Sequence, residues 1–377
     1  MSRLEQLHEL GQAPWLDFVE RGFVAEGRLA KLVEDDGITG VTSNPSIFEK
    51  AMGQGTAYDE QFGAVVAGDA SADANTVYEA LAIEDIRNVA DVLRPVFDRT
   101  EGRDGFVSLE VSPYLANDTD GTVTEGLRLW QAVDRPNLMI KVPGTSAGVP
   151  AIATLIEEGV NINVTLLFAI EAYQAVADAY VRGLEARAAA GKPIDAIASV
   201  ASFFVSRIDT KIDARIDERV AAGDPDADAL KALRGKVAIA NAKAAYRWYE
   251  QFTASDRWQA LAAKGAMPQR LLWASTGVKD PAYPDTLYVD TLIGPDTVNT
   301  LPPATMDAFR DHGTVASTLT ADVADAEHVL ADAERLGLDL AGVTSDLVEE
   351  GVRAFSASAD TLLGAVEEKR QRFVQAR

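Results

Sequence analysis

The sequence predicts an α/β protein, specifically a (β/α)8 TIM barrel with additional N- and C-terminal helices. Short runs rich in β-branched and aromatic residues alternate with longer stretches that repeat apolar residues at helical spacing. Eight such runs can be counted, which is the number that this barrel requires. A chain of 377 residues, 47% of them hydrophobic, can also bury a large core.

The expected strands follow one another along most of the chain. They are PWLDFV (14–19), GITGVTS (37–43), FVSLEVS (106–112), NLMIKV (137–142), GVNINVTLLF (159–168), IASVASFFV (197–205), LLWAST (271–276) and TLYVDTL (286–292). A doubly wound open sheet shows the same alternation and is the alternative fold. GTVAST (313–318) is a possible ninth strand.

Helices are expected before, between and after these strands. Residues 1–13 and roughly 20–35 show helical spacing, and residues from about 320 to 377 form a helical C-terminal segment. No stretch rich in Pro, Gly or Ser marks a linker. We therefore expect residues 1–377 to form a single barrel domain.

Composition excludes several classes of function. The 35 basic and 58 acidic residues give a net charge of −23, which repels nucleic acid and anionic membranes, so that a phosphate site must be a local basic pocket. The absence of cysteine removes disulfides, cysteine-ligated metals and thiol catalysis. The three histidines, His8, His312 and His328, have no metal-ligand spacing, so no metal site is expected. The N-terminus lacks the apolar core of a signal peptide and no stretch suggests a membrane span, so we expect a cytoplasmic protein.

Lys141 interrupts the apolar run of NLMIKV. Because strand side chains alternate between faces, Leu138, Ile140 and Val142 suit the helix layer, and Lys141 points into the barrel near the strand's C-terminal end. A lysine can also protect an exposed sheet edge, but a closed barrel has no edge. The parity therefore favours a functional lysine.

Other strands repeat this pattern, with polar side chains on the inward face near their C-terminal ends. For any one position a hydrogen-bonded core group is the alternative, but the joint pattern indicates a site at the rim where barrel enzymes carry their catalytic groups. The inward residues are Asp17, Thr42, Asn44, Ser108, Glu110, Ser112, Asn161, Asn163, Thr165, Ser202 and Phe204, and Ser275 lies near the end of the seventh strand.

These residue types fit the chemistry of an aldolase that uses no metal. A lysine amine removed from water can attack carbonyls and form Schiff bases. Glu110 and Asp17 can move protons, and Thr165 can hold a water molecule between them. Arg207 and Lys279 follow the sixth and seventh strands, near the usual phosphate site of this fold, and can bind a phosphate group. For each of these two cations taken alone, a surface salt bridge is the alternative.

The sequence resembles the transaldolase family, in particular its longer subgroup with a WASTGVK segment. The resemblance extends from about residue 14 to 310 and is weaker in the C-terminal helices. It rests on motifs that occur in order: GVTSNPSIFEKA, SLEVSP, NLMIKVPGT, NINVTLLF, ASFFVSRIDTKID and WASTGVKDPAYPDTLYVDTLIGPDTVNTLP. TSNPS alone also fits a helix N-cap followed by Pro45.

The resemblance implies a role for each matching residue. Lys141 would form a Schiff base with the C2 carbonyl of a ketose phosphate, and Asp17 would take the C4 hydroxyl proton. Glu110 and Thr165 would position the water that forms and hydrolyses the imine. Binding of the substrate would fall to Asn44, Ser202, Asn163 and Thr42 around the dihydroxyacetone unit, to Phe204 as a shield, and to Arg207 and Ser275 at the phosphate.

The implied activity is transfer of a dihydroxyacetone unit from sedoheptulose 7-phosphate to glyceraldehyde 3-phosphate in the non-oxidative pentose phosphate pathway. No cofactor is implied, since the imine serves as electron sink. Many members carry an arginine where this chain has Gly277, so we expect Lys279 to supply that charge.

The alternatives are a fructose-6-phosphate aldolase, which tends to lack a glutamate matching Glu110, and a non-catalytic sugar-phosphate binding barrel. Sugar phosphates are the expected partners, and the choice between monomer and homodimer stays open.

Overall fold

A computed structural model describes residues 1–52, 56–69 and 71–375 of the chain. Within these ranges, eight parallel strands pair in chain order and close into a barrel through pairing of β8 with β1. The closed barrel confirms the predicted (β/α)8 class over the open sheet. The strands are β1 Gln12–Leu16, β2 Gly40–Val41, β3 Phe106–Glu110, β4 Leu138–Pro143, β5 Ile162–Leu167, β6 Ser199–Phe204, β7 Arg270–Ala274 and β8 Thr297–Leu301.

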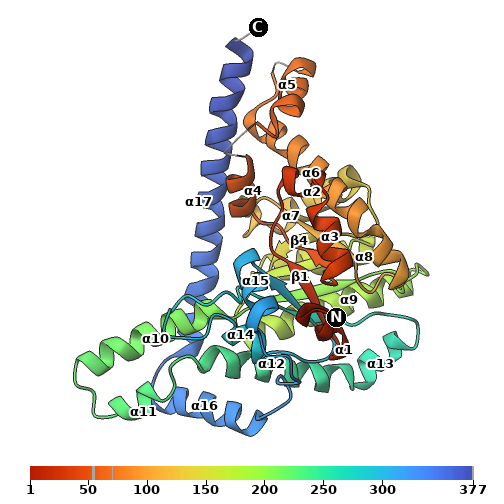
Figure 1. The fold of residues 1–377 in the computed structure, drawn as a ribbon. Helices are drawn as coiled ribbons and strands as arrows, with labels where there is room; N and C mark the ends of the chain where they lie inside the picture. The colour runs from red at the N-terminus through yellow and green to blue at the C-terminus, as the bar shows by residue number, and fades with distance from the viewer. Residues whose placement is uncertain (53–55, 70, 376–377) are drawn as a thin grey trace.

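Helices surround the barrel and extend beyond it at both ends of the chain (Figure 1). They are α1 Arg3–Glu9, α2 Arg21–Ala25, α3 Arg28–Asp35, α4 Pro45–Met52, α5 Asp59–Gly68, α6 Ala74–Arg99, the short 3-10 helix η1 Pro113–Leu115, α7 Thr119–Val133, α8 Gly148–Glu158, α9 Ile170–Ala189, α10 Ser206–Ala221, α11 Ala227–Lys231, α12 Val237–Thr253, α13 Asp256–Ala262, α14 Leu287–Asp290, α15 Pro303–His312, α16 Val323–Arg335 and α17 Leu340–Gln375. None of the helices in the described ranges combines the length and apolar character that a membrane crossing needs.

The predicted eighth strand is wrong. Residues 286–292 form α14 and the turns around it, and the eighth strand is instead Thr297–Leu301, which pairs with both β1 and β7. The possible ninth strand at 313–318 contains no strand. The run TLYVDTL is short and contains apolar residues on both parities, so its periodicity cannot distinguish a helix from a strand.

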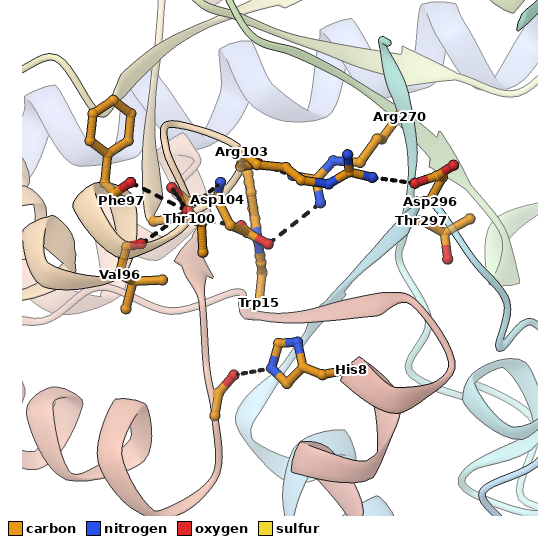
Figure 2. A network of polar contacts seen from close by, with 12 residues as sticks. His8, Trp15, Val96, Phe97, Thr100, Arg103, Asp104, Arg270, Asp296 and Thr297 are labelled. Carbon is orange, nitrogen blue, oxygen red and sulfur yellow. Dashed lines mark hydrogen bonds and ion pairs between the residues drawn. The ribbon is translucent and has the colours of Figure 1, made fainter. Parts of the chain in front are cut away.

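The floor of the barrel, at the N-terminal ends of the strands, is closed by a buried polar network (Figure 2). The Asp104 carboxylate accepts a hydrogen bond from Trp15 Nε1 at 2.8 Å and lies 3.4 Å from Nη1 of Arg270. Gly40 makes room for the indole, because a Cβ at this position would lie 2.3 Å from the Trp15 ring. The ion pair thus links the start of β7 to the segment before β3.

The long helix α17 runs past α4, where Ser358 and Ser46 share a hydrogen bond of 2.7 Å (Figure 1). Its Gly351 faces β5, since a Cβ there would lie 2.6 Å from Cδ2 of Leu166. The helix therefore covers part of the face at which the strands end. It also places Phe355 over the barrel mouth, where the centre of its ring lies 5.8 Å from Nζ of Lys141.

Candidate active site

A cavity of about 660 Å³ opens at the C-terminal ends of the strands. Most of the residues singled out in the sequence line it: Asp17, Thr42, Asn44, Lys141, Thr165, Ser202, Phe204, Arg207, Ser275 and Lys279. Glu110 lines an adjoining apolar pocket, and Asn163 is buried below the cavity. The strand parity therefore brings these side chains together at one end of the barrel.

Lys141 lies at the bottom of this cavity and is 5% exposed. Its Nζ donates to the carbonyl of Ser43 at 3.1 Å and forms an ion pair with Glu110 Oε2 at 3.3 Å. Burial raises the pKa of Glu110, whereas the charge of Lys141 lowers it. Both Glu110 carboxylate oxygens and the Thr165 hydroxyl are buried without a hydrogen-bond partner among the described residues. Such orphaned polar atoms are suited to hold a water molecule beside the lysine.

Asp17 follows β1 and is the second carboxylate of the site. Its Oδ1 accepts a hydrogen bond of 2.6 Å from the Thr42 hydroxyl, which also lies 2.7 Å from the hydroxyl of Thr300 on β8. Burial raises the pKa of Asp17, while Lys141, the Thr42 hydrogen bond and Arg207 lower it. A carboxylate in this environment is better prepared to accept a proton than one in water.

A chain of hydrogen bonds crosses the barrel below the lysine. Ser202 Oγ donates to Asn163 Oδ1 at 2.7 Å, and Asn163 Nδ2 donates to Ser108 Oγ at 2.9 Å. Asn44 has two roles, because its Oδ1 accepts from the backbone N–H of Ile47 at the start of α4 while the residue lines the cavity. The helix cap and the site residue are therefore the same side chain.

Two backbone irregularities lie beside site residues. An extra residue in β5 shifts the register between Val164 and Leu167, and Leu166 takes a left-handed φ of 59° directly after Thr165. Ser275, directly after β7, has a φ of 55°, and its hydroxyl lies 3.0 Å from that of Ser206. A bulge re-aims side chains, and strained backbone of this kind concentrates at functional sites.

Three cations also line the cavity, namely Lys50 of α4, Arg207 and Lys279. Arg207 packs over the Phe204 ring at 5.2 Å, and Lys279 Nζ lies 3.9 Å from the position that a Cβ on Gly277 would occupy. None of these three cations forms an ion pair with a carboxylate of the described residues. In a chain with a net charge of −23, they make a local site for an anion.

Strand parity alone could not find every lining residue. Phe355 comes from α17, which no strand pattern predicts, and Lys50 lies in the last turn of α4. Thr300 lies on β8, whereas the eighth strand was predicted at residues 286–292. Thr300 and Lys50 carried a sequence signal, since they lie within the quoted motifs that end in VNTLP and SIFEKA, whereas Phe355 carried none.

No group of three or more His, Asp or Glu side chains within the described ranges is arranged to hold a metal ion. The site combines a buried lysine, two carboxylates and three cations in one barrel mouth. This geometry is typical of the class of barrel enzymes that act on carbonyl compounds through a lysine.

Comparison with known proteins agrees with this class. Residues 14–366 match the family described as Transaldolase/Fructose-6-phosphate aldolase, and the chain belongs to this family. It is 48% identical to Transaldolase 2 of Nostoc sp. over 374 residues, which cover 98% of both chains. It is 49% identical to the transaldolase of Thiobacillus denitrificans, covering 97% of this chain and 100% of the relative. It is 50% identical to the transaldolase of Saccharopolyspora erythraea, covering 98% of both. The chain is therefore an enzyme, and its relatives carry the name of a transferase.

Proposed function

We propose that the enzyme is a transaldolase that moves a dihydroxyacetone unit between sugar phosphates through a Schiff base on Lys141. The donor is sedoheptulose 7-phosphate and the acceptor is glyceraldehyde 3-phosphate, which gives erythrose 4-phosphate and fructose 6-phosphate. The proposal places the enzyme in the non-oxidative pentose phosphate pathway of the cytoplasm, with residues 1–377 acting as a single barrel domain.

The reaction begins when the Lys141 amine attacks the C2 carbonyl of the ketose. Glu110, whose carboxylate is 3.3 Å from Nζ, is the nearest group that can take a proton from the ammonium. The carbinolamine then loses water to give the imine. Glu110 Oε1 and the Thr165 hydroxyl, which have no hydrogen-bond partner among the described residues, provide the polar atoms that would hold this water molecule.

Cleavage follows when Asp17 takes the proton of the C4 hydroxyl. The C3–C4 bond breaks, its electron pair moves toward the imine, and the aldose phosphate leaves with C4 as an aldehyde. The three-carbon enamine stays on Lys141. The Thr42 hydrogen bond at 2.6 Å orients the carboxylate of Asp17 for this step.

Transfer is the reverse of cleavage with a new acceptor. The enamine carbon attacks the acceptor aldehyde, Asp17 returns its proton to the new hydroxyl, and water hydrolyses the imine. Asn44, Asn163 and Ser202 would hold the hydroxyls of the dihydroxyacetone unit, while Phe204 shields the enamine. Arg207, Ser275 and Lys279 would bind the phosphate, with the Lys279 ammonium near the space that an arginine side chain on residue 277 would enter.

The observation that carries this proposal is the buried Lys141–Glu110 pair beside a cavity that is also lined by Asp17 and by three cations without an ion pair in the described part of the chain. The family description also names fructose-6-phosphate aldolase, which would release free dihydroxyacetone. Glu110 favours transfer over release. A non-catalytic binding barrel would have no use for a buried lysine beside two carboxylates.

A borohydride trap tests the proposal. The protein is incubated with fructose 6-phosphate, reduced and digested, and the modified peptide is identified by mass. We expect a three-carbon adduct on Lys141 and none on a Lys141→Ala variant. Adding erythrose 4-phosphate before reduction should discharge the fragment as sedoheptulose 7-phosphate. Release of free dihydroxyacetone in its place would identify an aldolase, and sugar binding without an adduct would leave only a binding protein.

A further inference from the structure

The segment 275–290 carries Ser275 and Lys279 at its start and two buried or half-buried tyrosines, Tyr283 and Tyr288, further along. Helix α10 begins next to Arg207 and carries Asp209 and Asp213. These two aspartates are four residues apart, so they lie on one face of α10, one turn apart. Both are buried, with exposed fractions of 1% and 5%.

Each aspartate accepts a hydrogen bond from one tyrosine of the segment. The Tyr288 hydroxyl donates to Asp209 Oδ2 at 3.0 Å, and the Tyr283 hydroxyl donates to Asp213 Oδ2 at 2.7 Å. A third contact lies next to Lys279, since Arg234 Nη2 is 3.0 Å from Asp280 Oδ2. These three contacts add to the direct bonds between Ser206 of α10 and Ser275, whose hydroxyls lie 3.0 Å apart and whose backbones are joined at 3.1 Å.

The second oxygen of each aspartate is also used. Asp209 Oδ1 accepts from the backbone N–H of Ala238 at 2.8 Å, and Asp213 Oδ1 accepts from that of Gly235 at 3.2 Å. Gly235 has a φ of 67°, and a Cβ at this position would lie 2.8 Å from the Tyr283 ring. Each carboxyl group therefore joins α10, the segment 275–290 and the start of α12.

Burial raises the pKa of Asp209 to about 7, against the lowering effect of its hydrogen bonds with Ala238 and Tyr288. Burial likewise raises the pKa of Asp213. Taking ionisable groups out of water in this way is unfavourable, and apolar packing could hold two segments together without it. Unlike apolar packing, directional hydrogen bonds fix the register between the segments that they join.

We propose that Tyr283–Asp213 and Tyr288–Asp209 form a clamp that sets the position of Lys279 relative to Arg207, and so determines the preference for phosphorylated substrates. Arg207 is carried by α10, whereas Ser275 and Lys279 are carried by the clamped segment. A shift of one against the other by a fraction of an ångström would separate charges that must converge on one phosphate group. The tyrosines and aspartates are thus positioning residues. This inference rests on the proposed phosphate site.

The test compares two acceptors, D-glyceraldehyde 3-phosphate and D-glyceraldehyde, in Tyr283→Phe and Tyr288→Phe. Phenylalanine keeps the packed ring and removes only the hydroxyl. We expect the KM for the phosphorylated acceptor to rise on the order of tenfold with little change in kcat, because charge convergence on the phosphate is lost. The kcat/KM for D-glyceraldehyde should stay within about twofold of the unmodified enzyme.

Tyr180→Phe is the matched control. Its hydroxyl is also buried and donates to the carbonyls of Met267 and Ile197, which precede β7 and β6 at the opposite end of the barrel. A general loss of stability would lower the activity with both acceptors equally in all three variants. That result would overturn the clamp. So would an unchanged ratio of kcat/KM for the phosphorylated acceptor to kcat/KM for D-glyceraldehyde in Tyr283→Phe and Tyr288→Phe.

The outcome also separates the clamp from the proposed function. A Lys141 adduct in the unmodified enzyme establishes the Schiff base whatever the tyrosine variants show. If the unmodified enzyme fails to distinguish the two acceptors, the phosphate site is wrong and the clamp with it. Arg207→Met could lower the ratio of kcat/KM for D-glyceraldehyde 3-phosphate to that for D-glyceraldehyde while the two tyrosine variants leave this ratio unchanged. In that case the phosphate site stands and the clamp alone fails.

Discussion

The buried charges of Lys141 and Glu110 stabilise each other, since Nζ and Oε2 lie 3.3 Å apart. Removing one member of such a pair leaves an uncompensated buried charge, which typically costs about 3–5 kcal/mol. Lys141→Met should therefore destabilise the enzyme at pH 8. Without the lysine, the folded-state pKa of Glu110 lies further above its unfolded value, so the stability lost at high pH returns as the pH falls and Glu110 binds a proton. Urea unfolding at pH 5 and pH 8 should show a smaller deficit at pH 5, and an equal deficit would contradict this account.

Glu110→Gln tests the proposed role of the carboxylate in moving protons. We expect kcat to fall by about 10²–10⁴-fold with little change in KM, because proton transfer is lost while the sugar contacts remain. Glu125→Gln is the control, since Glu125 lines the same adjoining pocket but accepts its hydrogen bond from the backbone of Ser112. Comparable losses in both variants would mean that the pocket, and not the Glu110 carboxylate, matters.

The residues that sequence could identify are those governed by strand parity. Lys141, Glu110 and Thr165 alternate with outward-facing apolar residues of their strands, and alternation alone directs them into the barrel. Phe355 reaches the same mouth from α17, and its position depends on how α17 packs against α4 and β5. No local pattern encodes that packing, so the residue could not be predicted.

At the level of elements, α17 depends on a glycine where it meets β5. Gly351→Ala should lower the thermal midpoint, because the new methyl group would lie 2.6 Å from the buried Leu166 side chain, which must shift beside Thr165. Gly364→Ala on the same helix has no atom within 4 Å of the new methyl group. It should stabilise by about 0.5–1 kcal/mol through helix propensity alone. Thermal melts of both variants check these expectations. If the two thermal midpoints shifted in the same direction, the steric conflict between residue 351 and Leu166 would be refuted.

The eighth strand shows where element prediction failed. TLYVDTL is rich in β-branched and aromatic residues, yet Tyr288 turns toward Asp209 of α10 and residues 287–290 form a helix. TVNTL supplies the missing strand because its register fits between β7 and β1. The two runs are only a few residues apart. Which of them becomes a strand depends on pairing with β7 and β1, and neither run alone contains that information.

At the level of the whole molecule, the two ends of the barrel have separate tasks. Asp104→Asn should destabilise the fold by about 3–5 kcal/mol, because the buried Arg270 would lose the carboxylate that balances its charge, while kcat stays within about twofold. Asp296→Asn removes the exposed partner of Arg103 in the same region and should cost at most about 1 kcal/mol. Urea unfolding and steady-state kinetics measure both, and a large fall in kcat for Asp104→Asn would contradict the separation.

The closure of the barrel also bears on how the chain reaches its fold. The pairing of β1 with β8 joins Gln12 to Thr297, residues that are 285 positions apart, whereas each of the other pairings joins consecutive strands. Contacts between such distant residues carry the largest loop-closure entropy and form slowly. Until they form, β1 and β8 are open edges that can pair with another copy of the chain. Refolding at high protein concentration should therefore lose material to association, and dilution should recover it.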